Sequence, residues 1–190
     1  MRIFKESKTL ELWVESVSES RFVLFKKYPI CRVSGGLGPK VASGDEQAPE
    51  GLYSVTQAQL NPRSRFYLAM NLGYPNAFEV ARGWTGEALM IHGGCASIGC
   101  YAMGDAAIAE IFTVVREALR AGQPSVSVQA LPFALTPENL ATHGDAPHRE
   151  YWQTLAPAYS SFETEHLPSR VRVTASGYRI EPARSGMAVP

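Results

Sequence analysis

The spacing of hydrophobic and polar positions along the chain predicts many strands and few helices. Apolar and polar residues alternate in LELWVE (10–15), and RFVLFKKYPI (21–30) is typical of a second strand, so residues 9–30 are expected to form a β-hairpin. Further strands are expected at 52–55, 64–72, 88–93, 125–133 and 170–175. This order of elements indicates a β-rich mixed α+β domain and not alternating βαβ units.

Two longer segments have helical spacing. DAAIAEIFTVVREALRAG is expected to be a helix with Asp105 as its N-cap and Gly122 as its stop signal. Its apolar face comprises Ile108, Ile111, Phe112, Val115 and Leu119. HREYWQTLAPAYSSFETEHL (148–167) is expected to be a helix interrupted or kinked at Pro157, and TPENL (136–140) to begin a short helix. Tyr151, Trp152 and Tyr159 of the second helix are expected to pack against the core.

Length and charge narrow the class of protein. The 190 residues suit one domain, and 18 basic residues balance 18 acidic ones without a basic, aromatic-rich stretch. This composition argues against nucleic-acid binding, and nothing approaches the roughly 20 apolar residues of a membrane span. MRIFKESKTLELWV at the N-terminus lacks the apolar stretch of a signal peptide, so we expect either a cytoplasmic protein or a mature form without its signal peptide.

The stretch MIHGGCASIGCYAMGD (90–105) concentrates reactive residues, and three interpretations compete for it. His92, Cys95 and Cys100 are ligand types that zinc accepts, but a structural site needs a fourth ligand, and Cys31 and His143 are distant in sequence. The two cysteines could instead be small buried hydrophobes or form a disulfide, with His92 in the core. The third interpretation is a Cys-His nucleophile.

The nucleophile interpretation requires the chain to double back between His92 and Cys100. Gly93, Gly94 and Gly99 permit such a tight return, and backbone N–H groups beside Gly99 could bind an oxyanion. The positive end of the helix that follows could lower the pKa of the thiol below about 8.5.

Several strings, in this order, resemble one protein family. IHGGCASIGCYAM resembles the signature of the L,D-transpeptidase catalytic domain family (YkuD type), in its YafK-like branch. SGGLGPKVASGDEQAPEGLYSV, NLGYPNAFE, LPFALTPENL and YWQTLAPAYSSFE resemble further segments of that branch. The resemblance covers about residues 8–180 and implies a β-sandwich-like catalytic core. We expect a single domain over 1–190, with a core at about 8–135 and a helical and strand extension at about 136–180.

The resemblance also implies roles for individual residues. Cys100 matches the nucleophile, and His92 matches the general base and acid. Gly93 matches the residue whose backbone steadies the imidazole, and Ser97 and Gly99 match the lead-in to the cysteine. Family enzymes attack the L-centre carbonyl of diaminopimelate in peptidoglycan stem peptides and form a thioester. An amine acceptor gives a transpeptidase, water gives a hydrolase, and neither a metal nor a cofactor is expected.

Two departures from the wider family leave the acceptor open. Ile98 replaces a histidine and Ala102 replaces an arginine, although the YafK-like branch shares both features. That branch includes enzymes that detach an envelope lipoprotein from peptidoglycan, so peptidoglycan stem peptides and a peptidoglycan-bound lipoprotein are the expected partners in the periplasm. The alternative is a catalytically lapsed binding module for peptidoglycan or an envelope protein. Cys95 is expected to be structural or to pair reversibly with Cys100, and Cys31 to be a buried filler.

Substrate contacts are expected from loops, because the substrate carries carboxylates and an amine. The candidates are Lys40, Asp45, Glu50, Asn76, Arg82 and Trp84. For each of them, the competing interpretation is an ordinary solvated loop residue. His143, His148 and His166 are expected at the surface.

Overall fold

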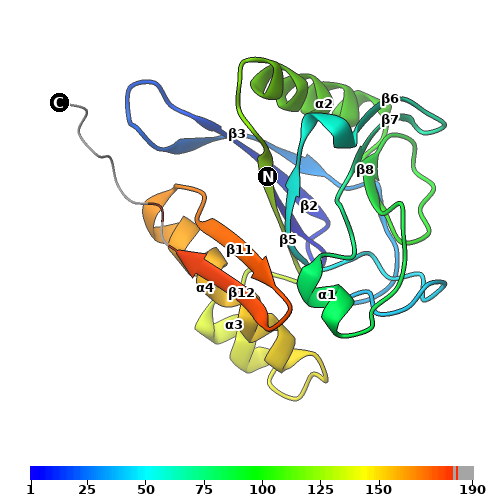
Figure 1. Cartoon of the computed structure of the whole chain (residues 1–190), viewed down its shortest axis with the longest axis vertical. Coiled ribbons are helices and arrows are strands. Elements are labelled where there is room, and N and C mark those ends of the chain that lie inside the picture. The colour runs from blue at the N-terminus through cyan, green and yellow to red at the C-terminus, as the bar shows by residue number, and fades with distance from the viewer. Residues whose placement is uncertain (182, 184–190) are drawn as a thin grey trace.

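Two five-stranded sheets form the body of the protein in the computed structural model, which describes residues 1–181 and 183 (Figure 1). The first sheet has the order β3 (Phe22–Pro29), β2 (Thr9–Glu15), β1 (Arg2–Phe4), β10 (Val126–Leu131) and β5 (Gly51–Val55). The second has the order β4 (Arg32–Val33), β9 (Tyr101–Ala102), β8 (Met90–His92), β7 (Tyr67–Asn71) and β6 (Leu60–Ser64). The predicted β-rich mixed α+β class with attached helices is therefore confirmed.

Helices and a separate hairpin complete the fold. These elements are the 3-10 helix Gln57–Gln59, α1 (Ala77–Ala81), α2 (Asp105–Arg120), α3 (Pro137–Thr142), α4 (Arg149–Glu165), β11 (Arg170–Thr174) and β12 (Gly177–Glu181). In Figure 1, α3, α4 and the β11–β12 hairpin lie together on one side of the sandwich, and α2 lies at its other end. Within residues 1–181, no helix is long and apolar enough to cross a membrane.

Strand alternation explains how the first sheet separates two cores. Successive side chains of a strand point to opposite faces. In β1, Ile3 therefore packs into the core that contains α2 and β8, whereas Phe4 packs into the core formed with α4. In β10, Ala130 and Leu131 divide in the same way. All five apolar positions predicted for α2 are buried, which confirms the helical pattern.

Two local predictions are wrong. Asp105 is the first residue of α2, and Gly104 is its N-cap. The helix α4 runs through Pro157, so the predicted interruption there is wrong, while the alternative of a kink stays a prediction. Pro157 lies on the exposed side of α4, and Gln153, whose carbonyl loses its helical partner, is also exposed. Water can satisfy that carbonyl, so the proline is tolerated within the helix.

Candidate active site

The parallel pairing of β8 with β9 brings His92 and Cys100 close together. Ile91 pairs with Tyr101, and His92 pairs with Ala102, so Cys100 lies one position before the paired residues of β9. The Met90 N–H contacts the Cys100 sulfur at 3.4 Å. Cys100 and His92 are thus two positions apart on adjacent strands, an offset of roughly 7–8 Å between Cα atoms. The chain doubles back as the nucleophile interpretation requires.

His92 is held by its own backbone. Its side chain is buried, and Nδ1 lies 2.6 Å from the Gly93 carbonyl oxygen. Because a carbonyl can only accept, Nδ1 carries the proton and Nε2 has the free lone pair. The ring also packs on Phe66, with centroids 4.5 Å apart. Burial lowers the pKa of His92, and the bond to Gly93 opposes that shift, so the imidazole is neutral near pH 7.

Cys100 is a buried free thiol. Its exposed fraction is 8%, and Sγ donates to the Ala88 carbonyl at 3.7 Å. Burial raises its pKa above 9.0, while the Met90 N–H and the charge of Lys40 oppose the shift. The net shift of the Cys100 pKa is therefore upward, and the possible lowering by the helix end stays a prediction. The N-terminus of α2 carries the Asp105 carboxylate, which accepts a hydrogen bond from the Gly94 N–H at 2.7 Å. The site holds a neutral thiol and a neutral imidazole.

Ser97 and Gly99 shape the backbone that leads into Cys100. The Ser97 hydroxyl accepts from the Cys100 N–H at 3.0 Å and donates to the Cys100 carbonyl at 2.7 Å. Ser34 also donates to the Ser97 carbonyl at 2.8 Å. Gly99 has a φ of +88°, and a Cβ there would lie 3.1 Å from the Leu89 side chain. The segment 97–99 before Cys100 is therefore a fixed turn that requires glycine at position 99.

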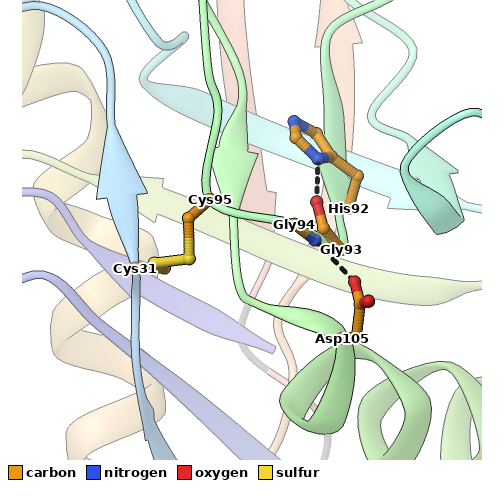
Figure 2. Close-up of a disulfide and its surroundings, with 6 residues drawn as sticks. All are labelled: Cys31, His92, Gly93, Gly94, Cys95 and Asp105. Carbon is orange, nitrogen blue, oxygen red and sulfur yellow. Dashed lines mark hydrogen bonds between the residues drawn. A yellow bond between two sulfur atoms is a disulfide. The ribbon is translucent and has the colours of Figure 1, made fainter.

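A disulfide joins Cys31 to Cys95 across 64 positions of sequence (Figure 2). The expected structural role of Cys95 agrees with this bond, whereas the alternative pairing of Cys95 with Cys100 is not what the structure has. The assignment of Cys31 as a buried filler is wrong, since Cys31 is exposed. The physical reason is the pairing of β4 with β9, which brings the segment after β3 beside the loop that carries Cys95. The bonded Cys95 is unavailable as a metal ligand. Within the described residues, no group of three or more His, Cys, Asp or Glu side chains could hold a metal.

Lys40 and Asp45 are the two substrate-binding candidates near the thiol. Their side chains form an ion pair of 2.6 Å, and Lys40 is close enough for its charge to act on Cys100. Burial alone would raise the pKa of Asp45, but hydrogen bonds from Lys40 and three backbone N–H groups outweigh it and lower the pKa to about 2. Asp45 is therefore ionised, and it pairs with a buried lysine whose charge acts on the thiol.

The other four candidates have partners within the fold. Glu50 is fully buried, so it has no exposed surface with which to bind a substrate. Asn76 caps α1 and donates to Tyr178 at 3.0 Å. The guanidinium of Arg82 lies 3.6 Å from the centre of the Phe78 ring, and Trp84 packs edge-on against Tyr151. These contacts do not themselves join the four side chains to Cys100, and their role in substrate binding stays a prediction.

The roles of two residues near the site were not predicted from the sequence. Asp105 was expected only to cap a helix, although its position directly after the cysteine segment was a usable signal. Cys31 gave no such signal, because its partner depends on the pairing of β4 with β9.

Comparisons with known proteins identify relatives of this chain. A family model described as the L,D-transpeptidase catalytic domain, YkuD, matches residues 11–128. YafK of Escherichia coli (strain K12), whose name as an L,D-transpeptidase is provisional, is 47% identical over 178 residues, which is 94% of this chain and 72% of that protein. YafK of Escherichia coli O157:H7 matches equally well.

Solved structures share the fold. The helical cell shape determining protein Pgp2 of Campylobacter jejuni matches with a TM-score of 0.56 and 16% identity, over 90% of this chain and 71% of that one. A point variant of Pgp2 matches with a TM-score of 0.57 and 20% identity, over 86% of this chain and 54% of that one. The chain thus spans about half the length of the second structure.

Proposed function

Because this chain belongs to the YkuD family of L,D-transpeptidase catalytic domains, whose members have peptidoglycan-related functions, we propose that it is a cysteine-dependent enzyme that modifies peptidoglycan stem peptides. Cys100 is the proposed nucleophile, and His92 the proposed general base and acid. The observation that carries the proposal is the arrangement of His92. Its Nδ1 is bonded to the Gly93 carbonyl, which leaves Nε2 free to take a proton in the strand next to a free thiol.

The first chemical step is acyl transfer to sulfur. Cys100 Sγ attacks the carbonyl carbon at the L-centre of diaminopimelate, and a carbon–sulfur bond forms. His92 takes the thiol proton at Nε2 and delivers it to the leaving amine as the carbon–nitrogen bond breaks. A thioester on Cys100 remains. In the second step, an amine or a water attacks the thioester and the thiol is restored.

The protonation states of Cys100 and His92 suit these two reaction steps. Burial holds Cys100 as a thiol and His92 as a neutral base, so the proton moves during attack and not before it. The thiol donates to the Ala88 carbonyl in the substrate-free protein, and this bond must break for Sγ to approach a substrate. Hydrogen bonds of catalytic groups are often long or misaligned before substrate binds.

The acceptor in the second step decides the class of reaction. Water would make the protein a hydrolase that cleaves a stem peptide or releases a peptidoglycan-bound lipoprotein. An amine would make it a transpeptidase. Peptidoglycan stem peptides and the bound lipoprotein lie in the periplasm, which is therefore the proposed location of this protein. Lys40 is the proposed contact for a substrate carboxylate, because its charge acts on the thiol. Its side chain donates to Asp45 and to the Ala42 carbonyl, which leaves one further N–H donor.

Product analysis tests the proposal. Diaminopimelate-type sacculi carrying bound lipoprotein are incubated with the wild type and with Cys100→Ala, and the products are identified by mass spectrometry. New cross-links or amine-exchanged stems would indicate a transpeptidase, whereas shortened stems or free lipoprotein would indicate a hydrolase. Equal product from both proteins would refute the role of Cys100. Binding to sacculi without any product would favour a catalytically lapsed binding module.

A further inference from the structure

The turn that follows His92 is bonded to the segment that opens α2. The Met103 N–H donates to the His92 carbonyl, and the Gly104 N–H donates to the Gly94 carbonyl, each at 2.8 Å. The Gly94 N–H donates in turn to Asp105 Oδ1 at 2.7 Å. Three hydrogen bonds therefore hold the turn against the start of the helix.

One peptide group links Asp105 to the imidazole (Figure 2). The Gly93 carbonyl and the Gly94 N–H belong to the same planar peptide unit. The carbonyl accepts from His92 Nδ1 at 2.6 Å, and the N–H donates to the Asp105 carboxylate at 2.7 Å. Because the unit is planar, fixing the direction of its N–H also fixes the direction of its C=O. Hydrogen bonds in a chain also polarise and strengthen one another.

We propose that Asp105 is a positioning residue, which holds the Gly93–Gly94 peptide so that its carbonyl keeps His92 in the Nδ1–H tautomer with Nε2 free. This inference rests on the proposed function for its catalytic consequence, but the tautomer itself does not depend on any substrate. Asp105 does not touch the imidazole, and it acts only through the peptide.

Crowding at Gly93 supports the same assignment. A Cβ at Gly93 would lie 2.7 Å from Asp105 Oδ1 and 2.6 Å from the Phe66 carbonyl oxygen. The carboxylate is thus packed directly over the peptide that it binds. Gly94 has a φ of +65°, a conformation that glycine adopts without strain. The close approach therefore requires glycine at position 93, and the backbone conformation favours glycine at position 94.

A purely structural role predicts something different. A carboxylate in the first turn of a helix stabilises it through the helix dipole, and Asp105 is exposed, so the loss of its charge would cost little. That role depends on charge and would leave His92 unaffected. The positioning role depends on an acceptor oxygen at one place. Asp105→Asn retains an oxygen and loses the charge, whereas Asp105→Ala loses both.

The experiment combines nitrogen NMR of His92 with kinetics on the same protein. The wild type, Asp105→Asn, Asp105→Ala and the control Glu117→Ala are labelled with 15N-histidine, and the signal of His92 is assigned by its absence from His92→Ala. Glu117 is an exposed residue farther along α2. Thermal unfolding confirms that each variant is folded.

We expect the Nδ1–H tautomer in the wild type, in Asp105→Asn and in Glu117→Ala, and a tautomer mixture in Asp105→Ala. In stem-peptide turnover, kcat should fall about tenfold or more in Asp105→Ala with little change in KM, since general acid–base catalysis contributes roughly 10²–10⁴-fold. Asp105→Asn should recover most of that loss. An unchanged tautomer in Asp105→Ala, or an equal disturbance in Asp105→Asn, would overturn the proposal. If Asp105→Ala shows the expected tautomer mixture but the wild type shows no turnover, the proposed function fails and the positioning role stands.

Discussion

The segment from His92 to Asp105 and the cluster around Glu50 use polar side chains in opposite ways. Glu50 is fully buried, and its carboxylate accepts from the Gly38 N–H at 2.8 Å and from Trp152 Nε1 at 2.7 Å, and pairs with Lys5 at 3.1 Å. Within the described residues, His92 Nε2 and the Cys100 thiol have no strong partners of this kind. Side chains that stabilise the fold have their bonding capacity satisfied, whereas the proposed catalytic atoms keep theirs available.

The Glu50 cluster also shows how the residues that follow the family match at 11–128 support the fold. Trp152 belongs to α4, which lies after residues 11–128, and Tyr151 of the same helix donates to the Glu50 carbonyl at 2.6 Å. The helix therefore anchors the loop that carries Lys40 and Asp45. Damage to the Glu50 cluster should appear in stability, and damage to the His92–Asp105 segment should appear in activity.

Removal of the thiol should give the largest effect. Cys100→Ser is expected to lower turnover of stem peptides by roughly 10³-fold or more, because the nucleophile is lost. Its free energy of unfolding should stay within about 1 kcal/mol of the wild type, since the change is close to isosteric. Turnover assays and urea unfolding measure the two quantities. Retained turnover would remove Cys100 from the mechanism.

The Glu50 cluster should show the reverse behaviour. Glu50→Gln removes the partner of a buried ammonium and is expected to cost about 3–5 kcal/mol of unfolding free energy. The matched control is Glu117→Gln, which breaks an exposed pair with Arg116 and should cost less than about 1 kcal/mol. Urea unfolding of both variants gives the comparison. Similar costs for the two would show that the Glu50 cluster does not stabilise the fold as described.

The disulfide ties the loop that carries Cys95, between His92 and Cys100, to the segment after β3. Cys31→Ser/Cys95→Ser opens a link across 64 positions and is expected to lower the unfolding free energy by about 2–4 kcal/mol. Reducing agent should lower the stability of the wild type and leave this double variant unchanged. A double variant as stable as the wild type would contradict the role assigned to the bond.

Glu79 is a buried carboxylate that, unlike Glu50, has no lysine partner among the described residues, and its pKa is raised. Burial raises its pKa to about 7, although hydrogen bonds from Tyr53 and the Asn76 N–H oppose the shift. Since the folded state holds this proton more tightly than the unfolded chain, stability should fall as pH rises from about 4.5 to about 7, by no more than about 3 kcal/mol. Glu79→Gln should flatten this slope in urea unfolding across that range. An equal slope in the variant would assign the pH dependence to other groups.

Sequence alone could predict the parts of the fold that have a strong local pattern. The β2–β3 hairpin and α2 follow from alternation and from helical spacing, and the regions of α4, β10 and β11 follow in the same way. The short strands β1 and β9 were missed because two or three residues carry no period, and their pairing depends on distant partners. The predicted strand at 64–72 contains β7 and the turn that leads into it from β6.

The features of the candidate site likewise divide into those that the local sequence predicts and those that depend on distant contacts. The pairing of β8 with β9 brings His92 and Cys100 together as the doubled-back chain predicts. The disulfide partner of Cys95 and the burial of Glu50 depend on contacts between segments far apart in sequence. The protonation state of Cys100 depends on burial in the finished fold, which its own sequence neighbours do not specify.

The most direct test of the account is the capture of the acyl-enzyme. The wild type and Cys100→Ala are mixed with a diaminopimelate-containing stem peptide, quenched in acid within seconds, and measured as intact protein and as peptides by mass spectrometry. The account predicts an added stem fragment on the peptide that contains Cys100, labile to hydroxylamine and absent from the variant. Turnover of the stem peptide by Cys100→Ala at the wild-type rate would contradict it.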